Sequence, residues 1–139
     1  MIEMIVVLVV LGLMLGLVIG RGPMRSPALD ARVAARELTQ ALRLARSRAI
    51  TLDRPVSLLL DRMAHDVRID GARSLALPRD VGVFAATPAG EVISDRVINI
   101  RFSSDGSSSG ARIALGAQGF RRVLVVDWLT GRVRIDDPR

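Results

Sequence analysis

Residues 29–54, LDARVAARELTQALRLARSRAITLDR, repeat their apolar side chains with the period of an α-helix. The apolar stripe is narrow and rich in alanine, and it comprises Ala34, Leu38, Ala41, Leu42, Ala45, Ala49 and Leu52. Another face of the same helix carries Arg32, Arg36, Thr39, Arg43 and Arg46. Because small side chains let a helix approach its neighbour closely, we expect this amphipathic helix to pack on a β-sheet.

The sequence that follows, residues 55–139, changes to short runs typical of β-strands, separated by turn signals such as Asp70-Gly71 and Asp105-Gly106. The candidate strands are residues 56–60, 66–69, 74–77, 81–85, 97–102, 112–115, 123–127 and 132–135. The last two are close enough to form a hairpin through residues 128–131. The fold class expected is therefore α+β, with the helix packed on an antiparallel β domain.

Upstream of the helix, residues 4–20 (MIVVLVVLGLMLGLVIG) carry no charge. As a helix this segment would be about 25 Å long, close to the roughly 30 Å hydrocarbon core of a bilayer. It lacks a basic flank before it and a small-residue cleavage site after it, so a retained anchor is favoured over a cleaved signal peptide. We therefore expect residues 1–20 to form a membrane-spanning helix that is the first half of a long N-terminal helix.

Two further features of the sequence concern the packing of this segment and the point where its helix ends. Gly12, Gly16 and Gly20 fall on one helix face, a spacing that lets membrane helices pack closely. Residues 21–28, which include Gly22 and Pro23, interrupt the helical pattern and predict a break or linker.

The composition excludes several function classes. The 139 residues include 20 basic side chains, all of them Arg, against 14 acidic ones, which gives a net charge of +6. There is no Cys and only one His, so disulfides, thiol nucleophiles and multi-His metal sites are excluded. We expect a protein that is not an enzyme and needs no cofactor or metal.

Several short motifs resemble one known family. Residues 1–8 (MIEMIVVL) are similar to the N-terminal segment of type IV pilin-like proteins, with Glu3 at the position of the family's signature glutamate. Residues 105–110 (DGSSSG), 112–115 (RIAL) and 129–133 (LTGRV) resemble the GspH/FimT pseudopilins, and most closely the H-class minor pseudopilins of type II secretion. This resemblance covers essentially the whole chain.

The resemblance implies a structural role in secretion. Such a protein is anchored in the inner membrane by a single pass, with its β domain in the periplasm, and joins other minor and major pseudopilins at the pseudopilus tip. Its other implied partners are the inner-membrane secretion platform and, more distantly, the secreted substrate or the outer-membrane secretin. Glu3 would pair with the N-terminal amine of a neighbouring subunit. The family also carries a basic leader that ends in Gly before Phe-Thr, and we expect such a leader to be encoded upstream of Met1.

The arginines leave a second function open. In FimT-like minor pilins a basic C-terminal region implies DNA binding, and Arg121, Arg122, Arg132 and Arg134 are the candidate anion or DNA contacts here. Nucleic acid remains the less favoured partner, because the chain has few aromatic side chains on which bases could stack.

Other possible sites have simpler interpretations. His65-Asp66 is expected to be an ordinary turn, and Asp61, Asp66 and Asp70 lack the spacing of a calcium loop. Residues 107–109 (SSS) lack the flanking glycines of a nucleophile elbow and predict a flexible loop. Trp128 is expected to pack at a strand end.

Overall fold

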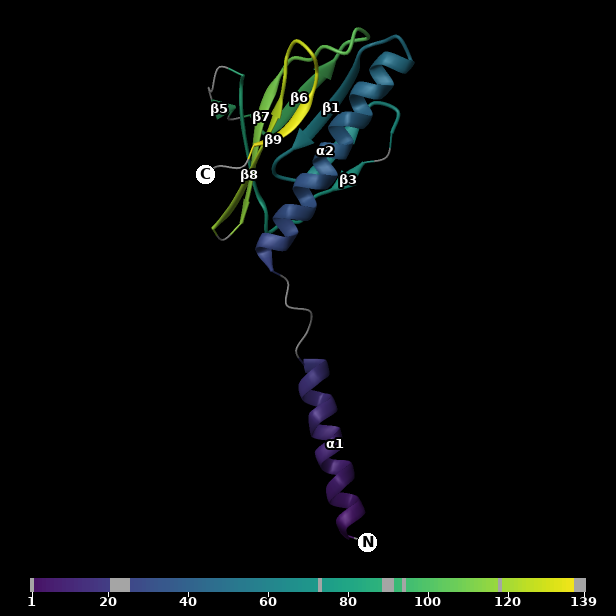
Figure 1. Ribbon diagram of the computed structural model, residues 1–139, viewed down its shortest axis with the longest axis vertical. Helices are drawn as coiled ribbons and strands as arrows, with labels where there is room; N and C mark the ends of the chain where they lie inside the picture. The colour runs from purple at the N-terminus through teal and green to yellow at the C-terminus, as the bar shows by residue number, and fades with distance from the viewer. Residues whose placement is uncertain are drawn as a thin grey trace.

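The computed structural model describes residues 2–20, 26–72, 74–88, 92–93, 95–117 and 119–136. Within these residues two helices precede nine strands, and all strand pairings are antiparallel (Figure 1). The helices are α1 (Ile2–Gly20) and α2 (Pro27–Thr51). The strands are β1 (Val56–Asp61), β2 (Asp66–Ile69), β3 (Leu75–Ala76), β4 (Gly82–Ala86), β5 (Val92–Ile93), β6 (Val97–Phe102), β7 (Ala111–Ala117), β8 (Phe120–Val126) and β9 (Val133–Asp136). The expected α+β fold, with a helix packed on antiparallel strands, is confirmed.

Helix α1 exposes every side chain that the structure describes along it, from residue 2 to residue 17. Gly12 and Gly16 both face open space, so no described residue uses the close approach that their spacing offers. The surroundings of Gly20 and the linker residues 21–25 lie outside the described residues. Among the residues described, no helix is both long and apolar enough to cross a membrane.

Helix α2 begins at Pro27 and not at residue 29. Proline suits this first position because it has the backbone angle of a helix and no N–H that needs a partner. Ser26 occupies the N-cap with an extended backbone, but its side chain makes no capping hydrogen bond. The helix ends at Thr51, three residues before the predicted end, because Asp53 adopts a left-handed conformation with φ of 47°.

The buried face of α2 is the alanine-rich stripe. Ala34, Leu38, Leu42, Ala45 and Ala49 are all 0% exposed. Two residues do not lie on the face of the helix to which the sequence analysis assigned them. Thr39, expected among the arginines, is buried at 5% exposure because its Oγ1 donates to the carbonyl of Ala35, 2.7 Å away. Leu52, expected in the stripe, caps the helix and is 50% exposed.

The strands form two sheets. The first has the order β3-β2-β1-β6, with Leu58 of β1 opposite both Ile69 and Ile100. The second has the order β5-β4-β7-β8-β9, with Ile113 of β7 opposite both Ala85 and Leu124. Alternate residues along β1, β2, β4 and β6 enter one shared core, as the period of a β-strand requires.

The strand predictions hold best where the pattern is long. The hairpin between β8 and β9 is confirmed, with Val125 opposite Arg134. The sequence analysis missed the two-residue β5, and it cut β7 and β8 short. These two strands run on to Ala117 and Phe120, where Gly119 takes a φ of +80° at the turn between them.

Helix α2 joins the two sheets. It contacts β1, β2 and β6 of the first sheet and β7, β8 and β9 of the second, and Figure 1 shows it lying across strands of both. Its alanines allow this because a side chain of one carbon keeps the helix close to two neighbours at once. The packed stripe of α2 is therefore the centre of the domain.

Replacing these alanines should unfold the domain. Ala45→Arg or Ala49→Arg would bury a charge and overpack the contact, so each should cost at least a few kcal/mol of unfolding free energy. Arg36→Ala and Arg43→Ala, on the exposed face, should change it by less than about 0.5 kcal/mol. Thermal unfolding of the full chain in detergent measures both effects. A larger loss in the arginine variants than in the alanine variants would mean that α2 faces the other way.

Candidate functional site

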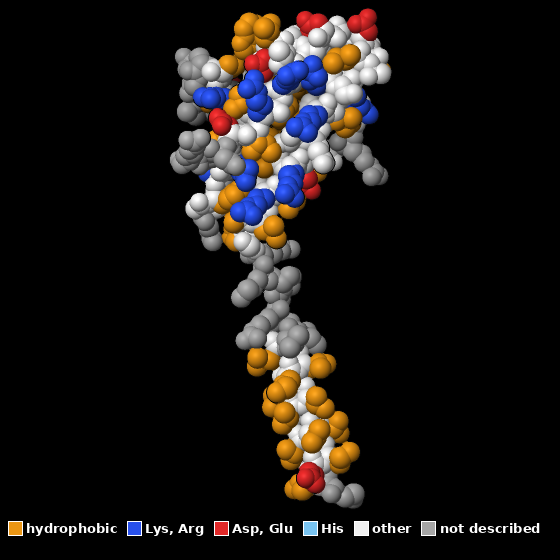
Figure 2. All heavy atoms as spheres, in the orientation of Figure 1, with side chains coloured by type: hydrophobic (Ala, Val, Ile, Leu, Met, Phe, Trp, Pro, Cys, Tyr) orange, Lys and Arg blue, Asp and Glu red, His pale blue; other side chains and the backbone are white. Residues whose placement is uncertain are grey.

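Among the candidate site residues of the sequence, the glutamate and the glycines lie on α1, and the four C-terminal arginines lie on β8, on β9 and in the loop between them. Glu3 lies in the first turn of α1 with its side chain exposed. The arginines of α2 and those near the C-terminus, which the sequence treats as separate groups, meet along the edge of the second sheet. Figure 2 shows basic side chains spread along this face of the domain.

These arginines line two hollows, and the larger one has a volume of about 390 Å³ and lies between α2 and β9. Arg43 and Arg46 line it from α2, and Gly131, Arg132, Val133 and Arg134 line it from β9 and the loop before it. We call this hollow the arginine groove. None of the described residues that line it carries a carboxylate.

A second, smaller hollow of about 120 Å³ continues the basic face toward the start of α2. Arg32, Ala35, Arg36, Arg122 and Ile135 line it. The guanidinium carbons of Arg32 and Arg122 lie 5.1 and 5.4 Å from the centre of the Phe120 ring, at cation–π distance.

Arg121 does not belong to this face. It follows Phe120 and precedes Arg122 on β8, and successive side chains of a strand point to opposite sides of the sheet. Arg121 is therefore exposed on the outer side of the second sheet, away from α2. Arg132 and Arg134 line the arginine groove and Arg122 lines the smaller hollow, whereas Arg121 lines neither.

Arg46 holds α2 in place through hydrogen bonds in addition to contributing a positive charge to the groove. Its Nε donates to the carbonyls of Gly106 and Thr130, at 3.2 and 3.0 Å. It thereby fastens α2 to the two loops that contain the DGSSSG and LTGRV motifs. Gly131 makes this junction possible, because its φ is +61° and a Cβ there would collide with the carbonyl oxygen of Gly106.

The loop between β8 and β9 is held in one shape by Asp127. The Oδ1 of Asp127 accepts hydrogen bonds from the backbone N–H and the hydroxyl of Thr130, at 2.8 and 2.9 Å. These bonds, helped by the nearby charge of Arg134, hold the pKa of Asp127 below its ordinary value. Ser108 braces the same loop by donating its hydroxyl to the carbonyl of Asp127 at 2.9 Å.

This well-braced loop presents two large apolar side chains to solvent. Trp128 is 60% exposed and Leu129 is 63% exposed. The prediction that Trp128 packs at a strand end is wrong, because the turn that Asp127 and Thr130 form directs both side chains outward. Sequence alone holds no signal for this exposure, since an isolated Trp is usually buried.

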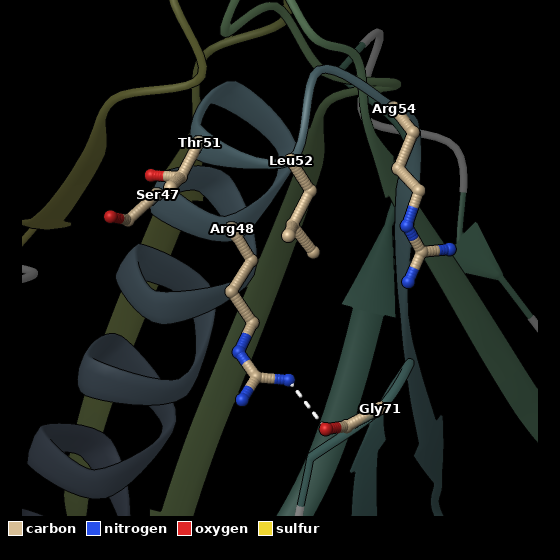
Figure 3. Close-up of a pocket in the computed structure, with 6 residues that line it drawn as sticks. All are labelled: Ser47, Arg48, Thr51, Leu52, Arg54 and Gly71. Atoms are coloured by element: carbon tan, nitrogen blue, oxygen red, sulfur yellow. Dashed lines mark hydrogen bonds between the residues drawn. The ribbon is translucent and has the colours of Figure 1, made fainter.

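The hollow beside the end of α2 is a structural junction (Figure 3). Its lining residues are Ser47, Arg48, Thr51, Leu52, Arg54 and Gly71. Arg48 donates from Nη1 to the carbonyl of Gly71 at 2.7 Å and to that of Asp70 at 3.3 Å. Arg48 thus ties α2 to the first sheet, as Arg46 ties it to the second.

The acidic candidates hold turns in place. Asp61 accepts from the N–H groups of Met63 and Ala64, both at 2.9 Å, and pairs with Arg96. The bond from Ala64, followed by the one from Arg96, lowers the pKa of Asp61. Asp66 pairs with Arg68 and Asp70 accepts from the N–H of Ser57. No group of three metal-ligating side chains occurs among the described residues.

The remaining candidates are also parts of turns. His65 takes a left-handed conformation with φ of 53°, and its buried Nδ1 makes no hydrogen bond. The three serines of residues 107–109 each make a hydrogen bond: Ser107 to Asp105, Ser108 to Asp127, and Ser109 with the N–H of Arg101. The loop expected to be flexible is thus pinned by its own hydroxyl groups.

Comparison with known proteins gives a family and a fold. Residues 34–131 match the family described as type II transport protein GspH. The fold is similar to that of the minor pseudopilin EpsH from the type II secretion system of Vibrio cholerae, with a TM-score of 0.67, 13% identity and coverage of 82% of this chain and 98% of that one. It is also similar to the type IV minor pilin FimU of Pseudomonas aeruginosa, with a TM-score of 0.59, 20% identity and coverage of 79% and 93%. No curated protein is significantly similar in sequence.

The junction at Arg46 predicts an unequal response of two glycines to the same substitution. Gly119→Ala places a side chain at positive φ in open space, so it should cost about 1–2 kcal/mol of unfolding free energy. Gly131→Ala adds the collision with Gly106 and should cost at least about 1 kcal/mol more. Thermal unfolding of the two full-length variants compares them. Equal losses would show that the loops do not meet as described.

Proposed function

The chain belongs to the GspH family of type IV pilin-like proteins, and we propose that it is a minor pseudopilin of a type II secretion system. The observation that carries this proposal is the family match, which begins in α2, includes every strand except β9 and ends at Gly131. The similarity of fold to the EpsH minor pseudopilin supports it. The resemblance found in the sequence motifs to this family is confirmed.

The proposed role is assembly and not catalysis. The protein would join other minor and major pseudopilins at the tip of the pseudopilus, on the inner-membrane secretion platform, for export across the outer membrane. At the tip of the pseudopilus the protein would be able to contact the secreted substrate or the outer-membrane secretin. The described hydrogen bonds of the serines, Asp61 and Asp70 support this view, since each helps to hold a turn or a loop. Asp66 pairs with Arg68 within β2.

We further propose that residues 1–20 anchor the protein by a single pass in the inner membrane, with the domain in the periplasm. The uncharged run of residues 4–20 supports this, because apolar side chains in such a run favour hydrocarbon over water. Every side chain described on α1 is exposed, and burial in lipid or against neighbouring pseudopilin helices would cover this apolar surface.

Glu3 is the proposed assembly residue. A carboxylate at the edge of a bilayer costs free energy unless it finds a positive partner. The N-terminal amine of an adjacent subunit would provide this partner only in the assembled filament. The pairing would then favour assembly over the isolated subunit in the membrane.

A second candidate function is DNA capture by a FimT-like minor pilin. The arginine groove and the smaller hollow favour it, because seven arginines line them and positive charge suits a polyanion. The fold is also similar to the FimU type IV minor pilin. Against it, the chain has few aromatic side chains on which bases could stack.

Removing the carboxylate of Glu3 should block assembly without blocking insertion. Glu3→Ala should insert in the membrane as well as the original chain, because a costly charge is gone, but it should enter the pseudopilus at least about ten-fold less. Crosslinking to neighbouring subunits in cells measures incorporation. Asp80→Ala, which removes an exposed carboxylate from the β domain, is the matched control and should assemble normally. Normal incorporation of Glu3→Ala would reject the role.

Salt dependence separates the two functions. We expect the full chain in detergent to bind DNA weakly at low salt and to release it at physiological salt, because unspecific phosphate contacts weaken as salt rises. The measurement is a fluorescence titration with single-stranded and duplex oligonucleotides. Tight binding that survives physiological salt, and that the paired changes Arg132→Ala and Arg134→Ala abolish, would favour DNA capture.

A further inference from the structure

We propose that the arginine groove and the adjoining side chains of Trp128 and Leu129 form a docking surface for an extended acidic segment of another protein. This inference deepens the proposed function and rests on it for the statement that the partner is a protein of the secretion assembly. The surface itself follows from charge, rigidity, exposure and strand pairing on the domain.

Among the described residues, no ion pair joins an arginine of the groove to a carboxylate. Arg43 and Arg132 are exposed, and in the part of the chain that the structure describes the ion pairs join Arg68 to Asp66 and Arg96 to Asp61, not the arginines of the groove. The charge of Arg134 helps to lower the pKa of Asp127, but the carboxylate of Asp127 already accepts two hydrogen bonds from Thr130. Carboxylates of a partner would match these guanidinium groups in charge and geometry.

The walls of the groove are rigid before any partner arrives. Arg46 bonds both loops, Gly131 packs against the carbonyl of Gly106, and Asp127 fixes the turn that leads to β9. A surface that is already ordered loses little conformational entropy on binding. Such rigidity suits a partner segment that is itself extended and becomes ordered on the groove.

Trp128 and Leu129 supply an apolar anchor next to this charge. Both side chains are more than half exposed, although the backbone beside them is held: the N–H of Ser108 donates to the carbonyl of Trp128 at 2.8 Å. Trp is strongly enriched among the residues that contribute most to binding at protein interfaces. An exposed Trp and Leu on a braced turn therefore fit apolar side chains that flank the acidic part of the partner.

Strand pairing favours a peptide over a nucleic acid. Among the described strands β9 pairs with β8 alone, so its other edge, which borders the groove, is open to an added strand. The phosphates of a nucleic acid would pair with the arginines, but they could neither add a strand at the open edge of β9 nor make an apolar contact with Leu129.

Trp128 reports on its own site, because it is the only Trp of the chain. The test uses the full chain in uncharged detergent at physiological salt, with a synthetic peptide of alternating Glu and Thr that ends in two Leu. We expect saturable binding with a shift of the Trp128 emission to shorter wavelength, as the ring leaves water. The same peptide with Gln in place of Glu should bind at least about ten-fold more weakly.

Matched variants locate the binding. Arg43→Gln together with Arg132→Gln should weaken binding of the acidic peptide about ten-fold or more, and Leu129→Ser should weaken it without changing the unfolding temperature. Arg79→Gln together with Arg112→Gln removes the same charge from exposed positions outside the groove and should have less than about a two-fold effect.

Three results would overturn the proposal. The first is that the two double arginine substitutions weaken peptide binding equally, and the second is that the emission of Trp128 does not change when the peptide binds. The third is that oligothymidylate or inorganic polyphosphate displaces the bound peptide at a lower concentration than the unlabelled peptide does. The last result would assign the face to polyanions. Because Glu3 takes no part in peptide binding, a failure here is distinct from a failure of Glu3→Ala to block assembly.

Discussion

The packing of one alanine-rich helix face against two separate sheets is the constraint on which the domain depends. Ala34, Ala45 and Ala49 are fully buried, and larger side chains there would push α2 away from one sheet or the other. At its end, Arg46 and Arg48 fasten the helix to loops of the second and first sheet through backbone carbonyls. Apolar packing sets the distance between the helix and the sheets, and these arginines fix its position along them.

This arrangement also determines where a partner could bind. Because one face of α2 is committed to the core, its arginines remain on the other face, beside the edge strand β9. Two loops that are far apart in the sequence close one end of the groove by meeting at Gly106 and Gly131. The same junction that stabilises the domain thus holds the basic groove and the exposed Trp128 and Leu129 in fixed positions.

The sequence predicted what depends on local periodicity and missed what depends on packing. The amphipathic helix was predicted because its pattern is long, and the last hairpin because its two strands are separated by only a short turn. The burial of Thr39 was not predicted, because it depends on a hydrogen bond within the helix, which the hydroxyl of Thr39 donates to the carbonyl of Ala35. Arg43 and Arg132 were named separately, and only the tertiary fold shows that they line one groove and that Arg121 points away. The exposure of Trp128 depends on hydrogen bonds between Asp127, Thr130 and Ser108, which no spacing rule encodes.

The central claim is that α2 has one face for the core and one for partners, and single cysteines test it directly because the chain has none of its own. Cysteines replacing Gln40 or Arg43 lie on the exposed face of α2, and one replacing Phe84 lies on the outer side of the second sheet. The measurement is their reaction rate with a maleimide in the isolated protein and in assembled pseudopili. The account predicts that all three react in the isolated protein and that assembly protects the α2 positions but not position 84. Protection of position 84 alone, with the α2 positions still reactive, would contradict it.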